Sequence, residues 1–194
     1  MSAYAYEDDP KRLAFTAARY KHVAKMLEGY NSVLEVGCAD GYFSRIVRQH
    51  VGSLTAIDID ESSIREAHNF QNRNSSQWHI KFEVSDITEY RLRRSGYDAV
   101  YSLDVLEHLQ PDAAFLSALF EAASIAVIGT PSLESQAHAS RLSLEGHVNC
   151  YSGPELKKRL QRYWSHVFMF TMHDEAIGTG FLPMANYLLA LCVK

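Results

Sequence analysis

The sequence contains few cysteines, and their spacing does not suit a metal site or a disulfide framework. The three cysteines, Cys38, Cys150 and Cys192, are odd in number, lie far apart and form no Cys-x-x-Cys pair. Paired cysteines are typical of structural zinc sites, and even sets of cysteines are typical of small secreted domains. We therefore expect reduced thiols and a cytoplasmic protein.

Long apolar segments are absent as well. No run approaches the roughly 20 apolar residues that cross a bilayer. The first residues, MSAYAYEDDPKRL, are polar and acidic, whereas a signal peptide is basic and then apolar. These features predict a soluble, intracellular protein that has no membrane partner.

Positive charge is not in excess. The chain has 19 lysines and arginines against 23 aspartates and glutamates, which gives a formal charge of -4 and a pI near 6.1. The basic residues are dispersed along the sequence, so we expect no cationic surface for nucleic-acid phosphates. A small-molecule substrate is favoured over nucleic acid.

The apolar residues that are present suffice for one domain. With 194 residues, of which 47% are hydrophobic, the chain is long enough for one substantial core and too short for two ordinary domains. The sequence shows no internal repeat and no low-complexity tract. We predict a single domain that covers residues 1–194.

Segments typical of strands and helices alternate along most of the chain. Strands are expected at 33–36, 54–57, 79–84, 97–103 and 125–128, and helices at 10–28, 42–51, 61–70 and 111–123. This alternation predicts an α/β fold with a Rossmann-like, doubly wound and mostly parallel sheet. A helix at 153–164 and strands at 167–172 and 185–193 are expected to complete a seven-stranded sheet with an antiparallel edge strand.

The segment 33–44, VLEVGCADGYFS, changes from an apolar run to a glycine-containing turn. The apolar run is typical of a buried parallel strand, and Gly37, Ala39 and Gly41 allow a tight turn that passes close to a ligand. The dinucleotide-binding fingerprint needs a third glycine where this chain has Tyr42. The turn therefore predicts a ligand site at the end of the strand but departs from the dinucleotide pattern.

An acidic residue lies at or just after the end of each of the first four predicted strands. These residues are Glu35, Asp58, Asp86 and Asp104. In an open parallel sheet, ligands bind in the crevice outside the carboxyl ends of the strands. One bound molecule that spans neighbouring strand ends explains the pattern, although acids at these positions also cap the following helices.

The segment 97–109, YDAVYSLDVLEHL, resembles the fourth-strand motif of class I S-adenosylmethionine-dependent methyltransferases, and the turn at 33–44 resembles their first motif. The sequence is similar to small-molecule methyltransferases related to ubiquinone-biosynthesis enzymes, and this likeness covers most of the chain. The phrases GTPSLESQAHAS and MHDEAIGTGFLPMANYLLALC are similar to bacterial methyltransferases associated with surface polysaccharides.

The resemblance implies a role in binding S-adenosylmethionine for each strand end. It places Glu35 at the amino group of the methionine moiety, Asp58 at the ribose hydroxyls and Asp86 at the adenine amino group. The full set of implied cofactor residues is Tyr20, Glu35, Gly37, Cys38, Ala39, Gly41, Tyr42, Phe43, Asp58, Ile59, Asp86, Ile87, Leu103, Asp104 and His108. Ala39 departs from the family, which commonly has glycine at that position.

Three further polar residues are candidates for catalysis. His108 follows the cofactor-lining segment, and its ordinary pKa near 6.5 suits a general base. His147 could deprotonate a hydroxyl group and Asn149 could orient it. Each of the three could instead shape the pocket or satisfy backbone groups, because alignment alone supplies much of the acceleration of methyl transfer.

A metal site is not expected from the sequence. Asp104, Glu107 and His108 are close together, but hard-cation sites need several oxygen ligands. No second acidic pair is positioned to complete such a site.

Together these features predict a methyltransferase that transfers a methyl group from S-adenosylmethionine to an oxygen of a small molecule. The acceptor would be a sugar, a phosphoryl derivative or a nucleotide-linked glycan precursor, and the protein a monomer or homodimer. Residues 1–29 would form a helical lid, and residues 131–151 a loop on the acceptor side. The alternatives are a non-catalytic partner protein with this fold and, less favoured, a nicotinamide-dependent oxidoreductase.

Overall fold

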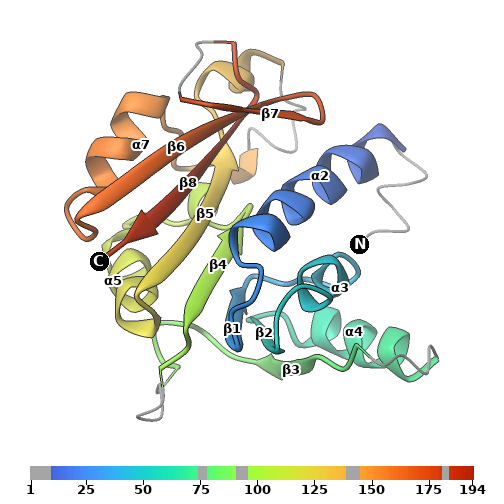
Figure 1. Cartoon of the computed structure of the whole chain (residues 1–194). Helices are drawn as coiled ribbons and strands as arrows, with labels where there is room; N and C mark the ends of the chain where they lie inside the picture. Colours follow the sequence, from blue (N-terminus) through green and yellow to red (C-terminus); the bar gives the residue numbers. More distant parts are fainter. Residues whose placement is uncertain (1–9, 74–77, 91–95, 139–144, 181–183) are drawn as a thin grey trace.

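The computed structural model describes residues 10–73, 78–90, 96–138, 145–180 and 184–194 (Figure 1). Residues 1–9 of the predicted lid and residues 139–144 of the predicted acceptor-side loop lie outside the described residues. Among the described helices, none combines the length and the apolar character needed to cross a bilayer.

The described strands form one mixed sheet in the order β3-β2-β1-β4-β5-β8-β6-β7. Its parallel part contains β1 (Ser32–Val36), β2 (Ser53–Asp58), β3 (Lys81–Val84), β4 (Ala99–Leu103) and β5 (Ile125–Pro131). Its antiparallel part contains β6 (His166–His173), β7 (Ala176–Thr179) and β8 (Tyr187–Val193). The predicted α/β fold with a mostly parallel sheet is confirmed.

The predicted strand count was wrong by one. The sheet has eight strands where the sequence predicted seven, because the short strand β7 pairs with β6 at the edge. Most of β7 is exposed to solvent, so it lacks the run of buried residues that marks β1, β4, β5 and β8. The antiparallel part is also wider than one edge strand, since β8 lies between β5 and β6.

Helices cover both faces of the sheet, as Figure 1 shows. One face packs against α2 (Lys11–Met26), α3 (Ser44–Arg48) and α4 (Glu61–Arg73), and the other against α5 (Ala113–Ala122) and α7 (Gly153–Leu160). Every residue of β4 is buried, as are the last four residues of β1. Burial on both faces explains why these strands read as continuous apolar runs.

Some helices are shorter than the sequence predicts. The α3 helix covers Ser44–Arg48 rather than 42–51, and α7 ends at Leu160. Two short 3-10 helices, η1 (Leu106–His108) and η2 (Glu134–His138), follow the ends of β4 and β5.

The strand order reverses next to β1. The chain leads from β1 to β2 on one side, and β4 later pairs with β1 on the other side. In doubly wound sheets, ligands bind outside the carboxyl ends of the strands at such a reversal of strand order. The glycine-containing turn and the strand-end acids therefore lie at the edge of the sheet where a ligand is expected.

Candidate active site

The turn after β1 has a backbone conformation that glycine adopts readily. Gly37 and Gly41 have φ angles of 83° and 64°, in the left-handed region where other residues are strained. A Cβ atom on Gly37 would also lie 2.1 Å from Val105 Cγ2. Ala39 has a φ angle of 48°, which costs a non-glycine residue roughly 1–2 kcal/mol. The turn is therefore strained and closely packed against the segment after β4.

Asp58, at the end of β2, holds this turn in place. Its Oδ2 accepts a hydrogen bond from the Ala39 N–H at 2.8 Å, and its Oδ1 accepts one from the Asp60 N–H at 2.9 Å. Each carboxylate oxygen keeps a second lone pair, so Asp58 can brace the turn and still accept hydrogen bonds from a ligand. The neighbouring Ile59 side chain is 74% exposed and is open to contact with a ligand.

Glu35 is buried in β1 without a cation beside it. Its side chain is 1% exposed, and Tyr20 on α2 donates a hydrogen bond to Oε1 at 2.8 Å. Its other oxygen, Oε2, is buried and makes no hydrogen bond of good geometry among the described residues, while the Ser44 and Tyr101 hydroxyls lie close enough to the carboxylate to oppose the rise of its pKa. Burial raises the pKa of Glu35 to about 7. A ligand ammonium group would supply the missing partner and stabilise the carboxylate.

Asp86 and Ile87, after β3, lie apart from these contacts. The Asp86 carboxylate accepts hydrogen bonds from the backbone N–H and the hydroxyl of Thr88, both at 2.8 Å. Ile87 is buried and packs in the core under α5 and α7. These contacts shape the loop after β3.

Arg19 on α2 forms an ion pair with Asp104 after β4. Arg19 Nη1 lies 2.8 Å from both carboxylate oxygens of Asp104, and the guanidinium carbon lies 3.8 Å from the centre of the Tyr187 ring. Asp104 itself has a φ angle of 56°. The contact joins α2 to the ends of β4 and β8, so the N-terminal helix covers this part of the sheet edge.

Glu107, His108 and His147 lie together beyond Asp104. Glu107 is 1% exposed, and its Oε2 accepts a hydrogen bond from the Thr130 hydroxyl at 3.0 Å. Burial and the nearby Asp104 carboxylate raise the pKa of Glu107 to about 8. The His108 and His147 ring centres are 5.2 Å apart. Burial and the neighbouring His108 lower the pKa of His147, which favours a neutral imidazole at pH 7.

Similar proteins are found by sequence. A family model described as a methyltransferase domain matches residues 33–125. An uncharacterized methyltransferase of Mycobacterium tuberculosis (strain H37Rv) is 34% identical over 91 residues, which are 47% of this chain and 44% of that protein. A ubiquinone biosynthesis O-methyltransferase of Psychrobacter arcticus is 22% identical over 57% of this chain and 43% of that protein. The chain therefore matches less than half the length of these relatives.

Solved structures show the same fold over nearly the whole chain. The methyltransferase domain of bacterial CtHen1-C has a TM-score of 0.75 at 21% identity, covering 92% of this chain and 98% of that chain. The N-methyltransferase NodS of Bradyrhizobium japonicum has a TM-score of 0.70 at 19% identity, covering 97% and 98%. Together these likenesses support a class I S-adenosylmethionine-dependent methyltransferase. The predicted family is confirmed.

In this methyltransferase fold, several of the predicted cofactor residues pack against the turn after β1 and expose little surface to solvent. Cys38 and Leu103 are buried in the core on the α2 side of the sheet. Phe43 packs against Tyr20, with ring centres 5.6 Å apart, and against Tyr42 at 5.2 Å. Tyr42 is 47% exposed, so among these aromatic residues it presents the most surface to a ligand.

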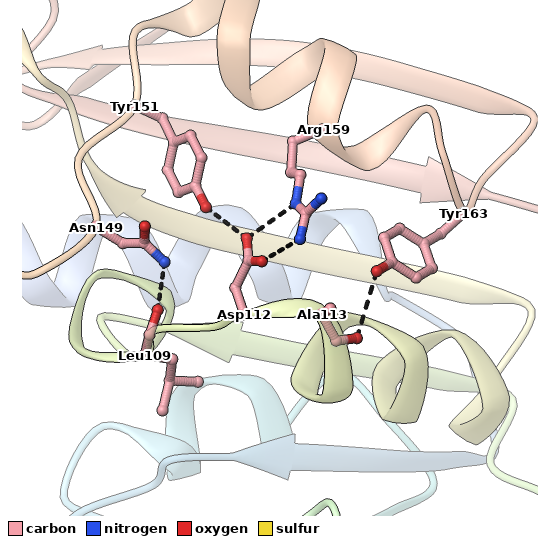
Figure 2. A network of polar contacts seen from close by, with 7 residues as sticks. All are labelled: Leu109, Asp112, Ala113, Asn149, Tyr151, Arg159 and Tyr163. Atoms are coloured by element: carbon pink, nitrogen blue, oxygen red, sulfur yellow. Dashed lines mark hydrogen bonds and ion pairs between the residues drawn. The ribbon is translucent and has the colours of Figure 1, made fainter.

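Asn149 helps to hold the loop between β5 and α7, which the sequence predicted to lie on the acceptor side. Its side-chain amide donates a hydrogen bond to the carbonyl oxygen of Leu109, as Figure 2 shows. Its backbone N–H donates to the carbonyl oxygen of Glu107 at 3.0 Å. One of the two N–H groups of the amide is thus used by the protein, which fits the structural alternative, and the second N–H and the side-chain oxygen stay available for the predicted orientation of an acceptor.

A buried polar network supports the same loop. Tyr151 donates a hydrogen bond to Asp112, and Arg159 on α7 forms an ion pair with the same carboxylate, with Nε 3.0 Å from Oδ2 (Figure 2). Asp112 is 5% exposed. This network connects the loop after residue 145 to the start of α5 and to α7.

Sequence reasoning missed the supporting residues of the acceptor side. Thr130, Gln136 and Gly146 contact Glu107, His147 and His108 respectively. No motif in the sequence distinguishes these residues, because each acts through a contact with a residue far away in the chain. The pairing of His108 with His147 was likewise not predicted, although each residue was named as a candidate.

Proposed function

We propose that this methyltransferase binds S-adenosylmethionine at the carboxyl ends of β1, β2 and β3 and methylates an oxygen of a small molecule. The observation that carries the proposal is Glu35, a buried acid beside the strained turn at the reversal of strand order, with one oxygen that makes no hydrogen bond of good geometry among the described residues. A buried carboxylate without a cation is unfavourable, and a ligand ammonium group corrects this. Asp58 and Asp86 follow at the next two strand ends.

The chain's own residues would hold and orient the cofactor. Glu35 would accept hydrogen bonds from its ammonium group, and Asp58 would accept them from ribose hydroxyls through its remaining lone pairs. The closely packed turn at Gly37 lets the backbone approach the ligand. When bound, S-adenosylmethionine supplies an electrophilic methyl group on a positively charged sulfur atom. Solved relatives include NodS in complex with S-adenosylhomocysteine.

The acceptor would lie on the side of Glu107, His108 and His147. A neutral hydroxyl is a poor nucleophile until its proton is removed, whereas a free amine already carries a usable lone pair. A group that accepts this proton or binds a cation meets that need, and Glu107, His108 and His147 lie together at one place. Two mechanisms fit: one imidazole acts as the general base, or a bound cation lowers the pKa of the hydroxyl.

We also propose how the whole protein is organised and what it acts on. Residues 1–194 form one domain, α2 within residues 1–29 acts as a lid through its contacts with Glu35 and Asp104, and residues 131–151 face the acceptor. The acceptor is a sugar, a phosphoryl derivative or a nucleotide-linked precursor. The protein acts in the cytoplasm as a monomer or homodimer.

Titration calorimetry tests the donor half of the proposal. We expect heat from S-adenosylmethionine and S-adenosylhomocysteine and none from NAD. Glu35→Gln should weaken binding of both ligands, while the matched control Glu121→Gln, an exposed residue on α5, should leave it unchanged. Absence of binding by both sulfur ligands would contradict the proposal, and heat from NAD alone would favour the oxidoreductase.

An assay of methyl transfer tests the part of the proposal that concerns the acceptor. Radiolabelled S-adenosylmethionine is incubated with the protein and with pooled sugars, sugar phosphates and nucleotide sugars, and label transfer is measured. Transfer to a hydroxyl group is the expected result. Tight cofactor binding without transfer to any acceptor would favour the non-catalytic partner protein.

A further inference from the structure

Three potential metal ligands converge on the acceptor side of the sheet edge. Glu107, His108 and His147 each offer one ligand atom, and these atoms lie within 4.8 Å of one another. Two of them come from η1 and the third from the loop after residue 145, so the cluster forms only when the loop folds back onto η1. We infer that these three residues bind a divalent cation.

Both histidines are oriented as metal-binding histidines are. His108 Nδ1 lies 2.8 Å from the carbonyl oxygen of Gly146. Because a carbonyl oxygen can only accept, Nδ1 donates this hydrogen bond, and Nε2 is the ring atom left to bind a metal. His147 Nδ1 lies 3.2 Å from Gln136 Oε1, which leads to the same assignment. Metal-ligating histidines almost always donate their other N–H to an oxygen in this way.

Hydrogen bonds also fix the position of the Glu107 side chain and backbone. The Thr130 hydroxyl donates to Oε2 at 3.0 Å and orients the carboxylate. The Glu107 carbonyl oxygen accepts the N–H groups of Val148 and Asn149 at 2.8 and 3.0 Å, which ties the loop that carries His147 to η1. The three ligand atoms are therefore brought together by backbone contacts that do not depend on a metal.

The charge balance points the same way. Glu107 is 1% exposed, and it has no ion-pair partner among the residues that the structure describes. The nearest arginine, Arg19, is bound to both oxygens of Asp104. A buried carboxylate is favourable only when a cation or several hydrogen bonds compensate for the lost water. A divalent ion at the cluster would provide that cation.

The ligand set indicates which ions fit. One carboxylate and two imidazoles suit Mn²⁺, Fe²⁺, Co²⁺ or Zn²⁺, whereas Ca²⁺ and Mg²⁺ prefer oxygen ligands alone. Three protein ligands leave further coordination positions open, as in catalytic rather than structural sites. An acceptor hydroxyl that binds beside the cluster would occupy one of these positions.

This assignment rests on the proposed function for its role in catalysis. Coordination lowers the pKa of the acceptor hydroxyl, whose proton passes to water. The oxygen then forms a bond to the methyl carbon while the carbon–sulfur bond breaks and its electron pair stays on sulfur. His108 and His147 would be ligands in this reaction and not general bases, and the substrate class is a hydroxyl compound that can bind a metal ion through oxygen.

Binding of Mn²⁺ in the absence of S-adenosylmethionine tests the site directly. The full chain is stripped with EDTA, dialysed and titrated with MnCl₂, and free Mn²⁺ is followed by electron paramagnetic resonance. We expect one bound equivalent. His108→Ala and His147→Ala should each weaken binding at least tenfold, and Gln136→Ala should weaken it about tenfold because that residue orients His147.

The matched control is His166→Ala, an exposed histidine on β6, which should bind Mn²⁺ as the wild type does. Circular dichroism of each variant shows whether it is folded, and the exposed position of His108 makes its alanine variant tolerable. No bound equivalent in the wild type, or equal binding in folded His108→Ala and His147→Ala, would overturn the assignment.

The same samples separate this inference from the proposed function. Calorimetry with S-adenosylmethionine on EDTA-treated protein reports the donor site alone. Loss of methyl transfer after metal removal, with cofactor binding retained and activity restored by Mn²⁺, supports the catalytic role. Full transfer in EDTA contradicts a catalytic metal while leaving the methyltransferase proposal intact.

Discussion

The donor side and the acceptor side of the candidate site are built in different ways. The donor side consists of a short contiguous turn, residues 37–41, and acids at the ends of neighbouring parallel strands. The acceptor side brings together η1, η2 and the loop after residue 145 through side-chain contacts. The difference shows that backbone geometry prepares the donor side, whereas long-range packing prepares the acceptor side.

The largest expected effect comes from breaking the donor side at Gly37. In Gly37→Ala the new Cβ would lie 2.1 Å from Val105 Cγ2, at a φ angle of 83°. Overpacking of this kind costs about 1–3 kcal/mol, and the left-handed backbone adds roughly 1–2 kcal/mol. Urea denaturation should show lower stability, and calorimetry should show loss of S-adenosylmethionine binding.

Gly178→Ala is the matched control for this change. Gly178 lies in β7, and a Cβ there meets no atom within 4 Å. We expect little change in stability or in cofactor affinity. Equal behaviour of the two variants would mean that the turn is not as closely packed as the structure indicates.

The next effect is the pH dependence that Glu35 imposes. Its pKa is about 7 in the fold and 4.5 as the ordinary value. Between these values the folded chain holds a proton that the unfolded chain has released, so stability falls as pH rises from about 4.5 to 7. By 1.36 kcal/mol for each pKa unit, the loss is at most about 3 kcal/mol. Urea denaturation at several pH values in this range should show that the free energy of unfolding falls with pH in the wild type and changes less in Glu35→Gln.

Proton release on binding of S-adenosylmethionine should also report the ionisation of Glu35. If an ammonium group pairs with Glu35, binding drives release of the Glu35 proton below pH 7. Calorimetry in two buffers with different ionisation enthalpies measures the number of protons released. Proton release that persists in Glu35→Gln would assign it to another group.

A smaller effect is expected from loosening the acceptor side at Asp112. Asp112→Ala removes the partner of Arg159 and Tyr151. A fully buried pair broken in this way costs about 3–5 kcal/mol. Arg159 is partly exposed at 22% and can turn to solvent, so we expect about 2 kcal/mol in urea denaturation. Cofactor affinity should be unchanged, and its loss would mean that the two sides are coupled.

The smallest effect is expected at Ala39. Ala39→Gly relieves a φ angle of 48°, worth roughly 1–2 kcal/mol. The greater freedom of glycine in the unfolded chain offsets about 0.5–1 kcal/mol of that gain. Stability should therefore rise by at most about 1.5 kcal/mol in urea denaturation. A clear decrease would show that the Ala39 methyl group makes a stabilising contact.

Much of the fold followed from local patterns. The buried runs of β1 and β4 and the alternation of strands and helices predicted the parallel sheet, because burial on both faces requires continuous apolar segments. The exposed strand β7 was missed because pairing with β6 makes it a strand, and no apolar pattern marks it. Helix ends were the least accurate, as the short α3 shows.

The sequence by itself determined the family, the glycine-containing turn and the acids that follow the strands, since each depends on neighbours along the chain. Only the tertiary structure decided that Arg19 neutralises Asp104, that Glu35 Oε2 makes no hydrogen bond of good geometry among the described residues and that His147 lies beside His108. The sequence argued against a metal because it showed no second acidic pair, but folding supplied a histidine from a distant loop. Contacts between distant residues depend on packing of the whole sheet edge, which no local spacing encodes.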